Sequence, residues 1–312
     1  MPPLTDVHVH LAALPDGDNG CIISPKMLRR PLARLVTWKF GVDFSKPAEA
    51  NALYVERLLA ELERSARVQK VVLLAMDGVY DAGGNLDRAR TDFLISNRYA
   101  LGVAQNHPDR FLAGVSVNPQ RRDALDELES VAAAGAALVK MLPNAQCFDP
   151  ADKRYVPFYR ALARLKLPLL SHVGYEFSLA GRDQSAGDPA RLRNALEEGV
   201  AVIGAHGCSQ GLFGYEPHLK TVGEFVHRYP RFYLDASALT LPNRADMLFI
   251  LKRHPEFQER LLFGTDYPLP VFAYPAIGRG YGDAARAPYF DRQAAVLDAV
   301  GLAFKDFSSI AA

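Results

Sequence analysis

The chain has 312 residues, of which 49% are apolar and 23% charged, and its formal net charge is +1. These values exclude an intrinsically disordered chain, and they leave no broad basic surface for nucleic acid or an anionic membrane. No apolar run reaches the length of a membrane span. The first residues lack the basic and apolar parts of a signal peptide, and three scattered cysteines cannot all pair. We therefore expect a cytoplasmic globular protein.

Eight short apolar runs alternate with amphipathic stretches along the chain. Most of the runs are rich in Val, Ile and Leu without a regular polar–apolar alternation, which is typical of parallel strands buried on both faces. We predict strands at 4–11, 70–76, 111–117, 137–142, 168–172, 201–206, 232–239 and 261–265.

Helical patterns fill the intervals between the apolar runs. In 52–64 and 123–134, apolar residues recur at the spacing that places them on one helix face. Gly135 and Gly199 stand where the helices before the next strands are expected to end. Strands that alternate with helices predict an α/β fold built from parallel β–α–β units.

Eight such units fit either a closed barrel or an open doubly wound sheet. Dividing the length by eight gives 312/8 = 39 residues per unit, enough for a barrel unit with insertions. Long strand-to-helix segments follow strands 1, 5 and 8, at 12–50, 175–187 and 267–289, and such segments build the functional end of a barrel. No Gly-rich phosphate loop follows the first strand. We predict a single (β/α)8 TIM barrel over residues 1–312.

The first predicted strand carries the sequence Asp6-Val7-His8-Val9-His10. Residues two apart on a strand share a face, so both imidazoles point the same way. Neutral imidazole is a good ligand for zinc and similar metals. A His-x-His pair alone is more often incidental than functional, but this pair lies at the end of a core strand, where a barrel places its active site.

Four other strand ends carry polar residues of the same kind. Lys140 interrupts the fourth apolar run, His172 and His206 end the fifth and sixth, and Asp266 follows the eighth. Each residue alone fits an ordinary hydrogen-bonded position at a barrel mouth. Together they mark one end of the barrel, where the strands converge. Four further histidines stand near helix ends and are expected to be structural or surface residues: His107, His218, His227 and His254.

The motifs at four strand ends carry a resemblance that covers residues 4–302. They are Asp6-Val7-His8-Val9-His10, His172-Val173-Gly174, Ala205-His206-Gly207 and Phe263-Gly264-Thr265-Asp266-Tyr267-Pro268. This ordered set resembles the amidohydrolase superfamily, and most closely its amidohydrolase 2 branch of metal-dependent TIM-barrel hydrolases and decarboxylases. The resemblance implies one divalent metal ion, usually zinc, held by His8, His10, His172 and Asp266. It also implies that His206 lies beside the metal and polarises or positions the substrate.

The implied ligand set agrees with the chemistry of its side chains. Three histidines and one carboxylate satisfy zinc while leaving a position for water or substrate, and coordination lowers the pKa of water towards ~7. Asp266 can accept the proton of that water and return it to the leaving group. His206 can stabilise a developing oxyanion.

Lys140 leaves the number of metal ions open. In binuclear relatives a carboxylated lysine on the fourth strand bridges two metals, whereas many members of the resembled branch carry a lysine there without a second metal. The simpler interpretation is an ordinary lysine that pairs with Asp266 or contacts a substrate carboxylate. We therefore expect one metal ion.

The long loops are expected to select a small-molecule substrate. Arg29, Arg182 and Arg279 are candidates to bind a substrate carboxylate through paired hydrogen bonds, and aromatic side chains near them suit a flat apolar substrate. A solvated loop surface, or an interface in a homo-oligomer, explains the same composition equally well.

We expect a metal-dependent hydrolase that attacks a small carboxylated amide, ester or lactone through metal-activated water. The alternative is a zinc-dependent non-oxidative decarboxylase of an aromatic or related carboxylic acid, and the ligand set does not separate the two reactions. A third hypothesis, a non-catalytic barrel that binds a ligand, is disfavoured by the intact Asp266.

Overall fold

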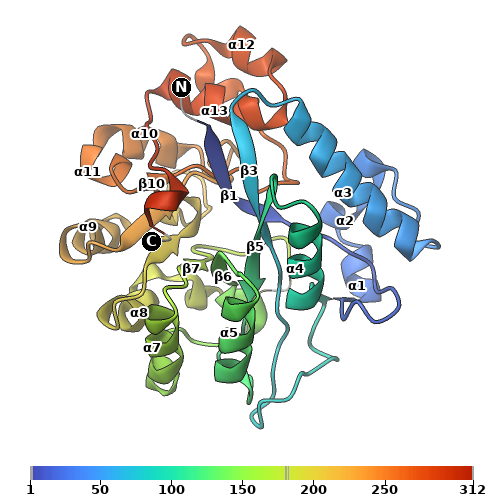
Figure 1. Cartoon of the computed structure of the whole chain (residues 1–312). Helices are drawn as coiled ribbons and strands as arrows, with labels where there is room; N and C mark the ends of the chain where they lie inside the picture. The colour runs from blue at the N-terminus through green and yellow to red at the C-terminus, as the bar shows by residue number, and fades with distance from the viewer. Residues whose placement is uncertain (1–2, 180, 182, 311–312) are drawn as a thin grey trace.

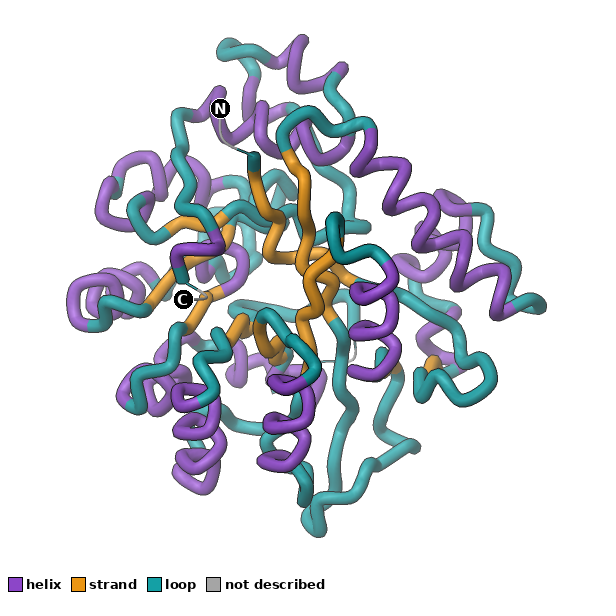
Figure 2. The backbone as a smooth tube through the Cα atoms, viewed as in Figure 1, coloured by secondary structure: helices purple, strands orange, loops and turns teal. Residues whose placement is uncertain are grey.

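Eight parallel strands form the centre of the molecule, as the computed structural model shows for residues 3–179, 181 and 183–310 (Figures 1 and 2). Hydrogen bonds join them in the order β1-β3-β5-β6-β7-β8-β9-β10. Each of the eight predicted strands is confirmed. Their bounds are β1 Leu4–His10, β3 Val68–Leu74, β5 Phe111–Ser116, β6 Leu138–Met141, β7 Leu169–Ser171, β8 Val202–Gly204, β9 Phe232–Asp235 and β10 Leu261–Leu262.

The two ends of this sheet meet, so that the strands form a nearly closed barrel. The main-chain N–H of Val7 donates to the carbonyl of Phe263 (3.0 Å), and the N–H of Asp266 donates to the carbonyl of His8 (2.9 Å). The buried Asp6 carboxylate reinforces the closure by accepting the Thr265 hydroxyl hydrogen at 2.6 Å. Burial raises the pKa of Asp6 to about 8 against the opposing effect of that hydrogen bond. The predicted TIM-barrel fold is confirmed.

Helices surround the strands and cover the outside of the barrel (Figures 1 and 2). Their inward faces are apolar, as the helical spacing of the sequence predicts. The main helices are α3 Pro47–Glu63, α4 Asn97–Asn106, α5 Ala124–Ala133, α7 Val156–Arg164, α8 Arg193–Glu197, α9 Leu219–Arg228, α10 Asp246–Arg253 and α13 Tyr289–Val300.

Three of the outer helices, α5, α7 and α8, end in the same way before the next strand. The residue after the C-cap is left-handed in each case: Gly135 after α5 (φ 89°), Lys166 after α7 (φ 55°) and Gly199 after α8 (φ 80°). The following N–H groups bond back into the last helical turn, which satisfies carbonyls that would otherwise lack a partner. These caps produce the short helix-to-strand connections.

The strand-to-helix segments contain further short elements. Between β1 and α3 lie β2 Ile22–Ile23, α1 Pro25–Leu28 and α2 Pro31–Phe40. The segment between β3 and α4 is also long, which the sequence analysis did not anticipate, and its strand β4 Phe93–Leu94 pairs antiparallel with β2. The remaining short elements are α6 Pro143–Gln146, α11 Pro255–Gln258, α12 Tyr281–Arg286, η1 Lys153–Tyr155, η2 Gln184–Gly187, η3 Pro189–Leu192, η4 Ala205–Cys208, η5 Tyr274–Ala276 and η6 Phe307–Ser309.

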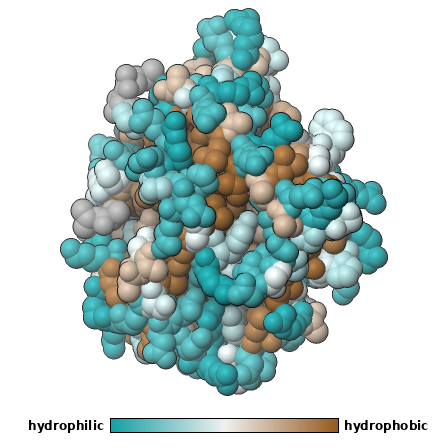
Figure 3. Space-filling model, turned by 45° about the vertical axis from the view of Figure 1, so that its right-hand side comes forward, coloured by the Kyte–Doolittle hydropathy of each residue, from teal (hydrophilic) through white to brown (hydrophobic). Residues whose placement is uncertain are grey.

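Hydrophilic residues cover most of the face shown in Figure 3, with apolar residues in patches between them. Within the part of the chain that the structure describes, no helix combines the length and apolarity needed to cross a membrane.

Candidate metal centre and substrate pocket

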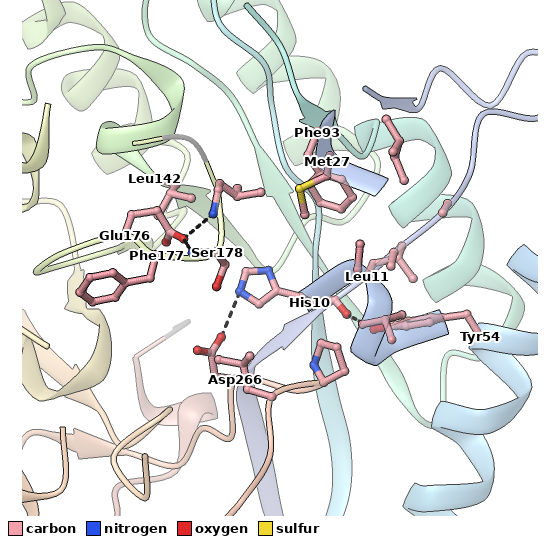
Figure 4. Close-up of a pocket in the computed structure, with 18 of the residues that line it drawn as sticks. His10, Leu11, Met27, Tyr54, Phe93, Leu142, Glu176, Phe177, Ser178 and Asp266 are labelled. Atoms are coloured by element: carbon pink, nitrogen blue, oxygen red, sulfur yellow. Dashed lines mark hydrogen bonds and ion pairs between the residues drawn. The ribbon is translucent and has the colours of Figure 1, made fainter. Parts of the chain in front are cut away.

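Three of the predicted metal ligands converge at the carboxyl ends of β1 and β10. One carboxylate oxygen of Asp266, Oδ1, lies 3.1 Å from His10 Nε2 and 3.4 Å from His8 Nε2. One ligand atom from each of the three residues lies within 4.8 Å of the other two. Figure 4 shows the His10 ring pointing towards the Asp266 carboxylate. The arrangement therefore brings three suitable donor atoms to one point.

A hydrogen-bonded carboxylate on β9 orients the first histidine. Asp235 Oδ2 lies 2.8 Å from His8 Nδ1, and both side chains are fully buried. A carboxylate accepts hydrogen bonds, so the His8 proton belongs on Nδ1, and its Nε2 lone pair faces the site. The other oxygen of Asp235 accepts the main-chain N–H of His206 at 2.8 Å. Asp235 thus connects the first strand with the residues after the sixth.

The tautomer of His206 follows from Ser237. The Ser237 hydroxyl lies 2.5 Å from Asp235 Oδ1, to which it donates, and 2.8 Å from His206 Nδ1. The main-chain carbonyl of Ser237, which can only accept, lies 3.2 Å from the same ring nitrogen. The hydrogen of His206 therefore belongs on Nδ1, and its Nε2 carries the lone pair.

His172 takes its orientation from His206. Its Nδ1 atom lies 3.1 Å from His206 Nε2 and donates to it, which leaves the lone pair of His172 on Nε2. That Nε2 atom is buried and has no hydrogen-bond partner among the described residues, and Glu176 Oε2 lies 3.7 Å away. A buried, unpartnered ring nitrogen suits a metal ligand, although His172 is not part of the close group of His8, His10 and Asp266. The contacts of His206 favour positioning of His172 over direct polarisation of a substrate.

Unusual backbone conformations aim these side chains. His206 (φ 59°) and Asp266 (φ 67°) both adopt left-handed conformations, which residues other than glycine rarely do. Gly174 (φ 84°) follows His172 closely in sequence, and a Cβ atom there would lie 2.2 Å from the carbonyl oxygen of Ser209. The turns after β7, β8 and β10 therefore permit little variation.

Burial keeps the imidazoles neutral and other interactions keep the carboxylate charged. Burial, with a contribution from the charge of Lys140, lowers the pKa of His8, and burial together with Arg244 lowers the pKa of His172 and His206 well below the usual value. Burial alone would raise the pKa of Asp266, but attraction to His8 and the hydrogen bond with His10 hold it well below its usual value. Neutral imidazole and ionised carboxylate are the forms that bind metal.

Lys140 is fully buried beside the same histidine. Its Nζ atom lies 3.3 Å from His8 Nε2. Burial lowers the pKa of Lys140 to about 8, although Asp235 and Asp266 act in the opposite direction. An uncarboxylated Lys140 therefore places an amine beside the imidazole of His8.

A cavity of about 460 Å³ opens onto this cluster. Residues of five strand ends reach its wall, and the segments after β1 and β7 supply much of the remainder. Figure 4 shows Glu176, Phe177 and Ser178 on one side of His10. The predicted residues that line the cavity are His10, Lys140, His172, His206 and Asp266.

Two of the three predicted substrate arginines lie away from the cavity. Arg29 and Arg279 are exposed and do not line the cavity, and Arg182 lies outside the described residues. Arg244 lines it instead and is 4% exposed. Its guanidinium donates to the carbonyls of Ser209 (2.8 Å) and Tyr175 (3.2 Å), and no described carboxylate lies within 4.0 Å of it. Sequence reasoning missed this residue.

Glu176 is a second wall residue whose role the sequence did not reveal. Its Oε1 atom accepts the main-chain N–H groups of Ser178 (2.5 Å) and Leu179 (2.8 Å), so the carboxylate shapes its own loop. Burial raises the pKa of Glu176 despite these hydrogen bonds. Its other oxygen lies 3.7 Å from His172 Nε2, so Glu176 forms the part of the wall next to the predicted ligand.

The residues present fit a divalent metal ion. His8 Nε2, His10 Nε2 and Asp266 Oδ1 converge, and the unpartnered Nε2 of His172 supplies a fourth donor of the right chemistry. Imidazole nitrogen and carboxylate oxygen in this ratio are typical of catalytic zinc sites. A second group of metal-binding residue types, His8, His206 and Asp235, is the hydrogen-bonded network described above, in which each ring Nδ1 carries a hydrogen.

A family model described as amidohydrolase matches residues 5–300, which confirms the resemblance inferred from the strand-end motifs. A search of curated proteins finds no significant match in sequence.

Solved structures share the fold at low sequence identity. A protein from Acinetobacter baumannii, described as a probable 2-pyrone-4,6-dicarboxylic acid hydrolase, is 13% identical (TM-score 0.57; 96% of this chain and 92% of that chain covered). The 2,6-dihydroxybenzoate decarboxylase from Rhizobium is 14% identical (TM-score 0.58; 99% and 96% covered). The 5-carboxyvanillate decarboxylase LigW from Sphingomonas paucimobilis is 15% identical (TM-score 0.53; 96% and 97% covered).

Proposed function

Because the chain belongs to the amidohydrolase family, we propose that it is a metal-dependent hydrolase of a carboxylated amide, ester or lactone. The observation that carries the proposal is the position of Asp266, whose carboxylate Oδ1 lies against two imidazole Nε2 atoms at the wall of a cavity. The same carboxylate is thereby placed beside both the metal donors and the space for a substrate.

We assign the metal to His8, His10, His172 and Asp266. A bound zinc ion would supply a Lewis acid for the substrate carbonyl and for a water molecule. Lys140 then remains an ordinary amine that attracts the substrate, and the site holds one metal ion. Measurement of the metal content per chain tests this assignment, since a carboxylated Lys140 with two ions would give about two equivalents.

The proton steps belong to Asp266. Its free oxygen can take a proton from the attacking water and return it to the leaving nitrogen or oxygen. The pKa of Asp266, held well below its usual value by His8 and His10, keeps the carboxylate in its ionised form. His206 holds His172 through the 3.1 Å hydrogen bond, so that the ring of His172 presents its lone pair to the site.

Arg244 supports a substrate that carries a carboxylate. Its guanidinium is buried and uses donors on two main-chain carbonyls. Asp266, Glu176 and Glu216 attract its charge, but no described carboxylate lies within 4.0 Å of it to form an ion pair. A bound carboxylate could pair with it directly through paired hydrogen bonds.

The test compares zinc-loaded protein with an Asp266→Asn variant on carboxylated lactones, amides and esters. We expect about one zinc per chain and hydrolysis that the variant loses by at least ~100-fold. Protein that retains less than ~0.3 metal per chain, and that added zinc does not restore, would contradict the proposal.

Decarboxylation is the second candidate, favoured by the cavity walls. A substrate carboxylate bound beside Lys140 and Arg244, with the substrate ring in the apolar part of the cavity, also suits the loss of carbon dioxide. Two solved structures that share this fold are named as decarboxylases. Carbon dioxide release from aromatic carboxylic acids, without hydrolysis of any ester or lactone, would replace the first candidate by the second.

The three cysteines are free, in line with the predicted location in a reducing cytoplasm.

A further inference from the structure

The cavity is chemically divided. Its charged groups come from the strand ends and the loops after them, and they include Lys140, Glu176, Arg244 and Asp266. A second part of its wall, which we call the apolar arm, consists of the lining residues of segment 11–54 together with Phe93. None of the residues that line the apolar arm is charged. In Figure 4, Met27 and Phe93 lie on the other side of His10 from Asp266.

The polar side chains of the apolar arm are already occupied. Asn51 accepts the N–H of Leu14 (2.7 Å) and donates to its carbonyl (3.0 Å). Thr37 donates to the carbonyl of Ala33 (2.8 Å), and Tyr54 donates to the carbonyl of His10 (2.7 Å). These hydrogen bonds satisfy the main chain, so the wall offers a ligand mainly hydrocarbon contact.

The apolar arm is anchored to the barrel. Ser24 caps α1 by accepting the N–H of Met27 (3.1 Å) and donates to Asp92 (2.6 Å). The β2–β4 pairing places Ile23 opposite Phe93, and both line the cavity. Arg30 donates to the carbonyl of Ser178 (3.1 Å), which joins the start of α2 to the loop after β7. The arm is therefore a built part of the pocket.

We propose that the apolar arm binds the hydrocarbon portion of an amphiphilic substrate, whose carboxylate and reactive carbonyl lie at the metal end. This inference rests on the proposed function for the position of the reactive group. A ring with polar substituents all around it would place some of them against the arm, where the polar side chains that the structure describes already bond to the main chain. An alkyl or aryl-alkyl chain leaves no polar group unsatisfied there.

Binding of a homologous series tests the arm without relying on turnover. Straight-chain carboxylates from acetate to decanoate are titrated calorimetrically into zinc-loaded protein. We expect the Kd to fall about fourfold per added methylene, equivalent to ~0.8 kcal/mol, until the arm is full. A Kd that does not depend on chain length would overturn the proposal.

Three variants on α2, one of them a control, locate the effect. Ala33→Trp fills the arm, and we expect it to bind acetate normally but to lose the gain from longer chains. The matched control is Leu35→Trp, on the same helix but exposed and outside the cavity lining, which should retain the whole gain. Val36→Thr, a milder change inside the arm, should weaken decanoate several-fold and leave acetate unchanged. Equal chain-length profiles in all four proteins would contradict the assignment to this wall.

The outcomes separate the two proposals. Turnover of short esters, together with a carboxylate Kd that does not depend on chain length, would contradict the proposed role of the arm and leave the hydrolase proposal standing. Chain-length-dependent binding by protein that takes up no zinc and hydrolyses nothing would retain the arm as a binding site and remove the proposed function.

Discussion

His8 Nδ1 and Asp235 Oδ2 lie 2.8 Å apart in the interior of the barrel, where neither side chain is exposed to solvent. This contact determines which nitrogen of His8 faces the cavity. Because the other oxygen of Asp235 accepts the N–H of His206 and the hydroxyl of Ser237, one carboxylate orients groups on β1 and in the segments after β8 and β9. The candidate metal centre is therefore supported by a residue that is not one of its predicted ligands.

Replacement of this carboxylate should weaken metal binding. In Asp235→Asn the amide can present its NH2 group to His8 Nδ1 and favour the wrong tautomer, so we expect a 10- to 100-fold increase in the zinc Kd. Competition with a chromogenic chelator measures it. Asp77→Asn is the control, since Asp77 is also buried but bonds to Gly78, Tyr80 and Asn118. Unchanged zinc affinity in a folded Asp235→Asn protein would show that the contact is not needed.

Loss of the buried guanidinium should affect substrates selectively. We expect Arg244→Gln to weaken a carboxylate ligand about 10- to 100-fold, since hydrogen bonds to charged groups contribute ~1.5–3 kcal/mol each. Zinc content should stay the same. The methyl ester of that ligand should bind both proteins equally, and Arg279→Gln, changed at the surface, should behave as the parent protein. A loss that is equal for the acid and its ester would refute a carboxylate contact.

The helix caps predict a pair of opposite stability changes. Lys166 is exposed and occupies the left-handed position after α7 that glycine occupies after α5 and α8. Lys166→Gly should therefore stabilise the protein by ~1 kcal/mol, and Gly135→Ala should destabilise it by about the same amount. A Cβ atom added at Gly135 would meet no other atom within 4 Å, so the second change measures only the cost of the left-handed backbone conformation. Urea unfolding of both variants measures the free energies, and two changes of the same sign would contradict the argument.

A half-buried histidine outside the candidate metal centre, His218, should give a pH-dependent contribution to stability. Burial lowers the pKa of His218 below its ordinary value of 6.5, although Asp188 acts in the opposite direction. The unfolded chain then binds a proton more readily than the folded one, so stability present above pH 6.5 is lost as the pH falls. Relative to His218→Asn, the parent protein should lose up to ~1.4 kcal/mol per pH unit below 6.5, until the folded pKa is reached. Urea titrations at pH 7.5, 6.5 and 5.5 measure the difference. A difference that stays constant across this range would be incompatible with the shift.

Much of the fold was predictable because strand positions and helix ends both depend on short stretches of sequence. Strands buried on two faces read as apolar runs, and residues such as Gly135 and Gly199 mark helix ends through backbone conformation. The long segment after β3 was not predicted, because its short strand β4 is stabilised by pairing with β2 from a distant part of the sequence.

The predicted metal ligands, Lys140 and His206 shared one signal, a polar side chain at or near the end of an apolar strand. Asp235 carries the same signal at the end of β9, but the predicted strand extended past it to residue 239, which hid its terminal position. Arg244 has no such signal. It lies in the loop beyond that strand, and only the folded chain shows that its guanidinium is buried beside the cavity.

The segment between His10 and α3 leaves the barrel at one strand end and returns to the outer layer without contributing a barrel strand. It supplies most of the apolar arm and none of the four assigned metal ligands. On the proposed assignments, selectivity for the hydrocarbon part of a ligand and the reaction at its polar end are encoded in adjoining but separate stretches of sequence. Exchange of this segment would then change the substrate range and leave the four assigned ligands in place.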